Sequence, residues 1–165
     1  MREPGELSAE LADEAATRAS GAAVAGALAA RATDRVLVTL SGELGAGKTT
    51  WVRGFLEALG APGPVRSPTY TLIESYPLAG RLVHHLDWYR LGDATDLEGL
   101  GFRDLAGSGQ WLLVEWPERV PAVAAEADLA VRLDYRVDGR HLGLRAGSAT
   151  GRAVLQAITT ANALG

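Results

Sequence analysis

The residues with the clearest capacity for chemistry form one glycine-rich stretch, residues 42–49. They read Gly42, Glu43, Leu44, Gly45, Ala46, Gly47, Lys48 and Thr49. This order fits the pattern G-x-x-x-x-G-K-[ST], which is typical of a phosphate-binding loop, or P-loop. Glycine lets the backbone turn closely around an anion through angles that a side chain would forbid. The amide groups of residues 43–49 can therefore point inward at a phosphate.

Two side chains at the end of this stretch complete the prediction. Lys48 can reach the β- and γ-phosphates of a nucleotide, and the Thr49 hydroxyl is placed to bind Mg²⁺. The positive end of the following helix adds to the field at the loop. Lys48 is also the only lysine among 16 lysines and arginines. We therefore expect residues 42–49 to bind nucleotide phosphates and Thr49 to hold the metal ion.

The segments on either side of the stretch supply the context that a P-loop requires. Residues 36–41, VLVTLS, predict a parallel strand. After the loop, Trp51, Phe55 and Leu59 recur every four residues, which predicts a helix over 48–59 with one buried face. Gly60 then ends this helix. The order strand, loop, helix favours a nucleotide site over a chance match to the pattern.

A P-loop site also needs a carboxylate at the end of a neighbouring strand, where it holds Mg²⁺ directly or through water. Asp87 ends the predicted strand 81–87, and Glu115 follows the apolar run 111–114. Because the run before Glu115 is the more apolar, we place Glu115 on a central strand beside the P-loop strand. Asp87 then orients the attacking water or holds a metal-bound water. The alternative for each is a carboxylate that caps a helix or pairs with an arginine.

Residues 65–71, VRSPTYT, carry hydroxyl groups ahead of a predicted strand over 70–76. Pro68 favours an extended conformation at Ser67. One interpretation is a turn that feeds the strand. The other is a switch loop in which Ser67 and Thr69 sense the γ-phosphate. The sequence leaves both interpretations open.

The nucleotide base is predicted in part. Guanine selection in most P-loop GTPases uses an Asn-Lys-x-Asp motif, and this chain cannot form it because its only asparagine is Asn162 and its only lysine is Lys48. Adenine is therefore expected. Trp116 can stack on an adenine, and packing in the core is the equal alternative. Arg140, which follows a predicted hairpin turn, is a further candidate to approach the nucleotide.

The rest of the pattern predicts an α/β fold, a P-loop NTPase-like three-layer sandwich with a mostly parallel central sheet and an antiparallel C-terminal hairpin. Alternating residues over 127–146 predict the hairpin, and residues 150–162 predict a closing helix. We expect one domain over 1–165, in which 1–16 is a weakly ordered tail. A short edge strand and a frayed helix both stay open for residues 7–11. Thr17 is predicted to cap a helix over 18–31.

Two further segments matter for the site. Residues 92–109 predict two short helical turns around Leu97 and Phe102. His84 and His85 are adjacent on a strand, so they project to opposite faces and cannot bind one metal ion together. Both are interpreted as ordinary strand residues.

Composition excludes several classes of protein. A net charge of −4 over 165 residues argues against a stand-alone grip on nucleic acid. The absence of cysteine excludes disulfides, thiolate nucleophiles and cysteine-based zinc sites, and it fits a reducing cytoplasm. The acidic start is unlike a signal peptide, and no apolar run is long enough to span a membrane. We therefore expect a cytoplasmic protein without a membrane partner.

Four motifs in this order resemble the TsaE (YjeE) family of small bacterial P-loop ATPases. They are Gly42 to Thr50, Ser67 to Tyr70, His85 to Leu91, and Val114 to Pro117. The resemblance covers residues 17 to about 140 and adds Thr50 to the expected nucleotide-binding residues. The family usually has Asp where Glu43 stands and Phe where Leu86 stands. Both departures are mild because neither removes a functional residue of a motif.

The resemblance implies both a function and roles for residues. Members of this family act with TsaB and TsaD, while TsaC supplies the activated intermediate, to form N6-threonylcarbamoyladenosine next to the anticodon of tRNA. The TsaE-like subunit hydrolyses ATP while docked on the TsaB–TsaD pair and meets tRNA indirectly, through the complex. The resemblance implies that Thr49 and Glu115 hold Mg²⁺, that Asp87 is needed for activity, that Trp116 lies near the adenine, and that Thr17 borders the nucleotide.

We therefore predict a slow, Mg²⁺-dependent ATPase whose output is the state of a partner. Its expected catalytic residues are Lys48, Asp87 and Glu115. Arg66, Arg90 and Arg103 are candidates for an arginine finger. The alternative is a small-molecule P-loop kinase with residues 92–109 as its lid. A third hypothesis is a non-catalytic module that uses nucleotide only for stability.

Overall fold

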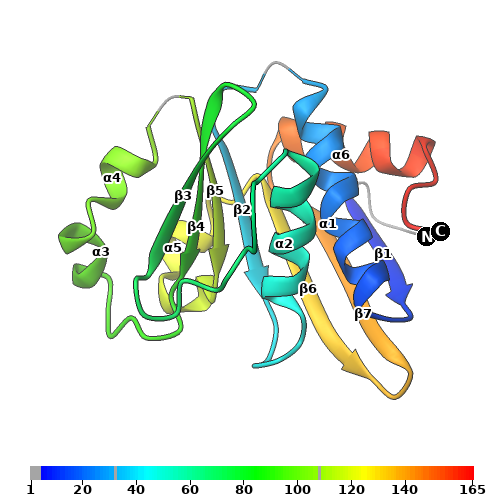
Figure 1. Ribbon diagram of the computed structural model, residues 1–165, viewed down its shortest axis with the longest axis horizontal. Helices are drawn as coiled ribbons and strands as arrows, with labels where there is room; N and C mark the ends of the chain where they lie inside the picture. Colours follow the sequence, from blue (N-terminus) through cyan, green and yellow to red (C-terminus); the bar gives the residue numbers. More distant parts are fainter. Residues whose placement is uncertain (1–4, 32, 108) are drawn as a thin grey trace.

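A seven-stranded mixed sheet runs through the computed structural model, which describes residues 5–31, 33–107 and 109–165 (Figure 1). The strands are β1 (Glu6–Leu11), β2 (Val36–Ser41), β3 (Ile73–Leu78), β4 (Arg81–Asp87), β5 (Gln110–Glu115), β6 (Leu129–Arg136) and β7 (Gly139–Ala146). The helices are α1 (Glu14–Ala29), α2 (Lys48–Ala58), α3 (Thr95–Gly99), α4 (Phe102–Leu105), the 3₁₀ turn η1 (Pro117–Arg119), α5 (Pro121–Ala124) and α6 (Ala149–Thr160). In the part of the chain that the structure describes, no helix has the length and apolar character needed to cross a bilayer.

The sheet is parallel in its middle and antiparallel at both sides. Its strand order is β1-β7-β6-β2-β5-β4-β3, and the neighbours β6, β2, β5 and β4 all run in the same direction. The pairs β1–β7, β6–β7 and β3–β4 are antiparallel. The expected parallel centre and C-terminal hairpin are both present, and the sheet as a whole is mixed. The carboxyl ends of β2, β5 and β4 therefore lie together at one edge of the sheet, where α/β proteins bind their ligands.

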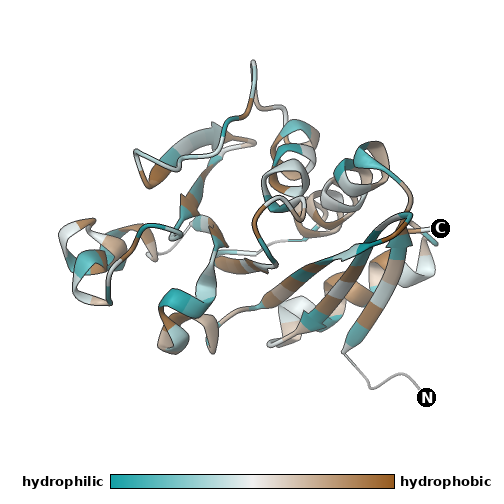
Figure 2. Cartoon of the chain, turned by 90° about the horizontal axis from the view of Figure 1, so that it is seen from below, coloured by the Kyte–Doolittle hydropathy of each residue, from teal (hydrophilic) through white to brown (hydrophobic). Residues whose placement is uncertain are grey.

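The central strands are buried on both faces, which explains their continuous apolar sequence. Along β2, Val36, Val38 and Leu40 pack with α1, α2 and α6, whereas Leu37 joins a second apolar cluster with Leu112 of β5. That second cluster includes residues of the segments from α3 to α5. Coloured by hydropathy, other strands of the sheet show alternating hydrophobic and hydrophilic segments (Figure 2). Along β6 this alternation separates buried from more exposed side chains.

Helices α1 and α2 pack closely because each has a glycine at the contact. A Cβ built on Gly54 of α2 would lie 2.0 Å from the carbonyl oxygen of Arg18, and one built on Gly21 of α1 would lie 2.1 Å from that of Trp51. No other residue fits at either position without moving a helix backbone. This contact holds α1 beside the start of α2, and with it the chain segment around Thr17.

The N-terminal predictions are partly wrong. Within the expected weakly ordered tail, residues 6–11 form β1, an edge strand paired with β7, and residues 1–4 lie outside the described residues. Helix α1 begins at Glu14, and its N-cap is Asp13, whose carboxylate accepts a hydrogen bond from the Ala16 amide at 2.8 Å. Thr17 therefore lies inside the helix, where it is buried and its hydroxyl donates to the Asp13 carbonyl.

The other boundaries agree more closely with the sequence. Strand β2, helix α2 and strand β4 match the predicted 36–41, 48–59 and 81–87 to within one residue. The two short helical turns are α3 and α4, and the closing helix is α6. The strand predicted over 70–76 instead spans residues 73–78, because it pairs antiparallel with β4 from Ile73 to Leu78.

The close contact between α1 and α2 makes a testable prediction. We expect Gly54→Ala to lower the free energy of unfolding by about 1–3 kcal/mol, because the added methyl group overpacks the contact with α1. Gly26→Ala is the matched control, since Gly26 is exposed on α1 and a Cβ there meets nothing within 4 Å. It should raise the same free energy by about 0.5–1 kcal/mol through helix propensity. Urea unfolding of both variants measures the difference, and equal effects would contradict the contact.

Candidate nucleotide-binding site

The glycine-rich loop connects the carboxyl end of β2 to the first turn of α2. Gly42, Gly45 and Gly47 have φ values of 146°, 79° and 109°, in the region that favours glycine. Gly47 is the N-cap of α2, and it has no side chain that could accept hydrogen bonds from the first turn. The amides at the start of α2 are therefore not capped from that position. Such a helix end is suited to bind an anion.

The β6–β7 hairpin holds this loop from one side. The hydroxyl of Tyr135 donates a hydrogen bond to the Leu44 carbonyl at 2.9 Å, and Nε of Arg140 donates to the Ala46 carbonyl at 3.0 Å. The Arg140 guanidinium also lies 4.5 Å from the centre of the Tyr135 ring. A Cβ on Gly45 would come within 2.4 Å of the Tyr135 hydroxyl. Two carbonyls of the loop are thus fixed by side chains from the hairpin.

Lys48 lies folded over the same loop. Its ammonium donates to the carbonyls of Gly42 and Glu43 at 2.6 and 2.8 Å, and it lies 4.2 Å from the centre of the Trp116 ring. Only 5% of the residue is exposed. Burial lowers the pKa of Lys48 below its usual value, while the nearby carboxylates, with Glu115 first, act in the opposite direction. The structure therefore places a desolvated cation inside the curve of the loop.

Strand alternation brings Glu115 to the start of α2. On β5, Trp111 and Leu113 pack in the cluster that contains α2 residues, and Glu115 continues the same face. Its Oε1 accepts a hydrogen bond from the Thr49 hydroxyl at 3.0 Å and lies 2.8 Å from Nε2 of His85. Glu115 is 2% exposed. A hydroxyl and a carboxylate in contact form the pair of oxygen donors that hard divalent cations prefer.

Asp87 is the register partner of Glu115 on the adjacent strand β4. It is buried, and its two oxygens accept hydrogen bonds of 2.9 Å from the Ser67 hydroxyl and from the Tyr89 amide. The Ser67 and Thr69 hydroxyls are 2.9 Å apart. The loop around Ser67 is therefore tied directly to a carboxylate at the sheet edge. This contact is what a loop that senses the state of the site requires.

Trp116 turns the chain sharply after Glu115. It has φ 62° and ψ 50°, a left-handed conformation that bulky residues rarely adopt. The turn is held by a hydrogen bond of 3.1 Å from the Trp116 amide to the Leu40 carbonyl. The indole is thereby placed against Lys48, and its centre lies 5.0 Å from that of the Tyr89 ring. Backbone strain of this kind is concentrated at functional sites.

Two cavities adjoin the glycine-rich loop, and most of the predicted site residues line one or both of them. A cavity of about 340 Å³ has 12 lining residues: Leu44, Gly45, Gly47, Lys48, Thr49, Thr50, Ser67, Thr69, Asp87, Tyr89, Glu115 and Trp116. A second, of about 290 Å³, is lined by Ala12, Asp13, Glu14, Thr17, Gly45, Gly47, Thr50, Gly139 and Arg140. Gly45, Gly47 and Thr50 line both. The predicted catalytic and switch residues therefore share the first cavity with Trp116, and Thr17 and Arg140 share the second.

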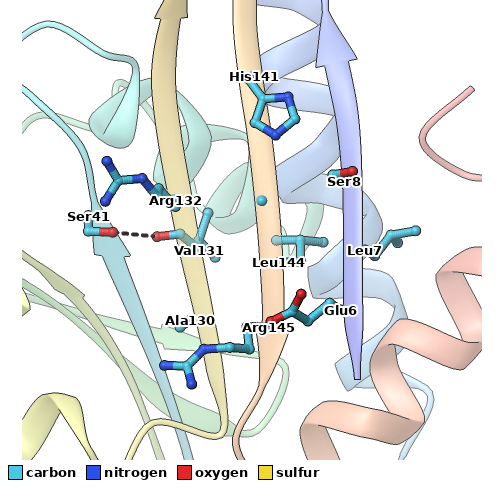
Figure 3. Close-up of a pocket in the computed structure, with 11 residues that line it drawn as sticks. Glu6, Leu7, Ser8, Ser41, Ala130, Val131, Arg132, His141, Leu144 and Arg145 are labelled. Carbon is cyan, nitrogen blue, oxygen red and sulfur yellow. Dashed lines mark hydrogen bonds between the residues drawn. The ribbon is translucent and has the colours of Figure 1, made fainter. Parts of the chain in front are cut away.

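A larger hollow, of about 560 Å³, lies on the polar face of β1, β7 and β6 (Figure 3). Glu6, Ser8, Arg132, His141 and Arg145 are among the residues that line it. None of the predicted site residues does. The hollow reaches Ser41 at the end of β2, but it shares no lining residue with either loop cavity.

Comparison with known proteins assigns the chain to a family. The model of the family "Threonylcarbamoyl adenosine biosynthesis protein TsaE" matches residues 11–142. The chain belongs to the TsaE family. It is 43% identical over 124 residues to the tRNA threonylcarbamoyladenosine biosynthesis protein TsaE of Haemophilus influenzae, covering 75% of this chain and 78% of that protein. It is 44% identical over 105 residues to the protein of the same name from Streptomyces coelicolor, covering 61% of this chain and 70% of that one.

A solved structure extends the likeness to the whole fold. The crystal structure of Bacillus subtilis YdiB superposes with a TM-score of 0.71 at 25% identity, covering 98% of this chain and 99% of that one. The α/β fold is therefore shared beyond the residues that the family model matches. Family membership gives this chain a role in threonylcarbamoyladenosine biosynthesis.

Sequence reasoning missed two side chains that shape the site of this TsaE-family chain. Tyr135 falls within the alternating run over 127–146 that predicts the hairpin, yet its hydroxyl donates a hydrogen bond to a carbonyl of the glycine-rich loop. His85 was interpreted as an ordinary strand residue, yet it contacts Glu115. The sequence held a signal for His85 alone: it is two residues before Asp87, on the same face of the same strand. No local signal marks Tyr135, because its partner lies 91 residues away.

The contact of the hairpin with the loop predicts the effect of Tyr135→Phe. Losing one hydrogen bond to the Leu44 carbonyl removes about 1 kcal/mol of support for the loop, so we expect phosphate-containing nucleotides to bind roughly fivefold more weakly. Tyr76→Phe on β3 is the control, since Tyr76 lines neither loop cavity. Titration with a fluorescent nucleotide measures both, and an unchanged affinity in Tyr135→Phe would show that the hairpin does not hold the loop in its binding shape.

Proposed function

We propose that this TsaE-family chain is a P-loop ATPase that binds ATP with Mg²⁺ and hydrolyses it slowly during threonylcarbamoyladenosine formation. One observation carries the proposal: Lys48, Thr49, Asp87 and Glu115 line a single cavity at the end of the glycine-rich loop. Each has the chemistry that phosphoryl transfer to water requires. The finer description of the fold as a P-loop NTPase-like three-layer sandwich is part of the same proposal.

The residues of the first cavity fit a metal bound together with phosphates. In residues 5–31, 33–107 and 109–165, no group of three or more acidic or histidine side chains is arranged to hold a metal by itself. Mg²⁺ is usually bound by one or two carboxylates together with phosphate oxygens, and Thr49 and Glu115 supply such a partial set. When bound, Mg²⁺ would neutralise charge on the β- and γ-phosphates.

The chain's own residues then divide the work. Lys48 exchanges the carbonyls of Gly42 and Glu43 for phosphate oxygens, and burial strengthens that attraction. Asp87, held by the Tyr89 amide, orients the attacking water. Ser67 and Thr69 report on the γ-phosphate, because Ser67 is hydrogen-bonded both to Thr69 and to Asp87.

The second cavity is where we place the nucleoside. Its lining includes Thr50, which also lines the first cavity, together with Thr17 and Arg140, two residues predicted to border the nucleotide. If adenine binds there, Arg140 lies beside the base and Trp116 does not, because the two residues line different cavities. Trp116 lies on the phosphate side, where its ring covers Lys48. We therefore assign Trp116 to holding the lysine rather than to stacking on adenine.

The kinase alternative is less well supported by the arrangement. Its lid would need an arginine over the first cavity, but Arg103 on α4 is 91% exposed in its side chain and pairs with Glu98. The lining of the first cavity includes no arginine. An ATPase without an arginine of its own is slow until a partner acts on it. TsaB and TsaD are the partners that we propose, with tRNA reached through that complex.

Removing the carboxylate at the centre of the site tests the hydrolytic role. We expect Glu115→Gln to reduce Mg²⁺-dependent phosphate release from ATP by about 100-fold or more, because an amide is a poorer ligand than a carboxylate. Glu126→Gln, which alters an exposed carboxylate that lines neither loop cavity, should remain within about threefold of the wild type. A wild-type rate in Glu115→Gln would favour the non-catalytic module.

The partner role has its own test. With ATP and Mg²⁺ present, the wild-type protein should co-elute in gel filtration with a TsaB–TsaD pair from the same organism. Lys48→Ala should reduce the bound fraction about tenfold or more, since the lysine makes the phosphate contact that defines the nucleotide state. Failure to bind the pair in every nucleotide state would contradict the partner assignment and leave the ATPase proposal standing.

A further inference from the structure

Two adjacent histidines on β4 differ in their surroundings, although the sequence treats them alike. His84 is bonded to the Ser75 hydroxyl at 2.7 Å and to the Gln110 side chain at 2.6 Å, on the face of the sheet away from α2. His85 points to the other face, is 0% exposed, and lies 2.8 Å from Oε1 of Glu115. Of the two, only His85 contacts the predicted metal-binding group.

The hydrogen bonds around His85 determine its tautomer and leave one buried ring nitrogen without a partner among the described residues. An ionised carboxylate only accepts hydrogen bonds, so Nε2 of a neutral His85 carries the proton and donates it to Glu115. Nδ1 is then a buried acceptor, and it has no hydrogen-bond partner among the described residues. An unsatisfied buried acceptor lowers stability by about 1–3 kcal/mol. An apolar ring of the same shape would avoid this cost but would also remove the donor to the buried Glu115 carboxylate, so the histidine matters here through that contact.

The second donor on the same oxygen explains what His85 does. Oε1 of Glu115 also accepts from the Thr49 hydroxyl at 3.0 Å. When Thr49 and Glu115 turn their oxygens to a cation, the threonine can no longer hold the carboxylate in this way. His85 then remains as a donor that fixes its orientation. Groups that hold a ligating carboxylate typically change metal affinity by about 10–100-fold when they are removed.

We propose that His85 is a positioning residue for the metal: it orients Glu115 so that one carboxylate oxygen faces the cation beside the nucleotide. This inference rests on the proposed ATPase function and adds to it the group that sets metal affinity. The inference is about the affinity for Mg²⁺, and it makes no claim about nucleotide binding without the metal. His85 itself touches neither the metal nor the phosphates.

The experiment uses three variants of the full chain and one probe, a ribose-labelled fluorescent ATP analogue. Affinity is measured in EDTA and again during a Mg²⁺ titration. In His85→Phe the Mg²⁺ midpoint should rise about 10–100-fold, while affinity in EDTA stays within about twofold of the wild type. His85→Gln keeps an N–H donor that reaches Glu115, so the Mg²⁺ midpoint of this variant should lie within about fivefold of the wild-type value.

The neighbouring histidine provides the matched control. His84→Phe makes the same chemical change one residue away, on the opposite face, and should leave the Mg²⁺ midpoint unchanged. An unchanged Mg²⁺ midpoint in His85→Phe, or an equal rise in His84→Phe, would overturn this inference and leave the proposed ATPase function standing. If His85→Phe does not fold, as judged by circular dichroism, the inference stands or falls on whether His85→Gln keeps the wild-type midpoint. Wild-type protein that binds no nucleotide would overturn the proposed function and this inference with it.

Discussion

The parallel pairing of β2, β5 and β4 is the constraint on which the site depends. In this pairing Leu40 is opposite Glu115, and Glu115 is opposite Asp87, so three strands end at the same level. The loop leaves β2 at that level and returns as α2, which puts Thr49 against Glu115. A shift of one residue in β4 or β5 would turn its carboxylate to the other face of the sheet. The apolar residues that fix the register are therefore as necessary to the chemistry as the carboxylates.

Burial of charge is the second constraint, and the site meets it by pairing. Lys48, Asp87 and Glu115 are all at most 5% exposed. A buried charge without partners is strongly destabilising, but here Lys48 has two carbonyls and an indole, and each carboxylate has two donors. The pKa of Lys48 is still lowered by burial, because the carboxylates only partly offset desolvation. The site is thus held together because each of its buried charges has polar or aromatic partners within the chain.

Much of this arrangement could be predicted from the sequence, because it follows local patterns. The run before Glu115 identified a central strand, and the spacing of Trp51 and Phe55 identified α2. What the sequence could not show depends on distant residues. Strand β1 exists because it pairs with β7, about 130 residues away along the chain. Asp13 and Thr17 both suit a helix cap, so the sequence alone does not choose between them; in the structure Asp13 caps α1 and Thr17 lies buried inside it. Tyr135 contacts a loop carbonyl 91 residues away in the chain, and His85 meets Glu115 through the pairing of β4 with β5.

The carbonyls of the glycine-rich loop are held by two separate sets of hydrogen bonds. In the proposed ATPase, Lys48 would leave the carbonyls of Gly42 and Glu43 to reach a phosphate. Tyr135 and Arg140 hold the carbonyls of Leu44 and Ala46, and neither bond involves a group that the phosphates require. The loop therefore has an exchangeable set of contacts on its inner side and a permanent set from the hairpin. Because the hairpin already holds two loop carbonyls, part of the ordering cost of the loop is met before any ligand binds.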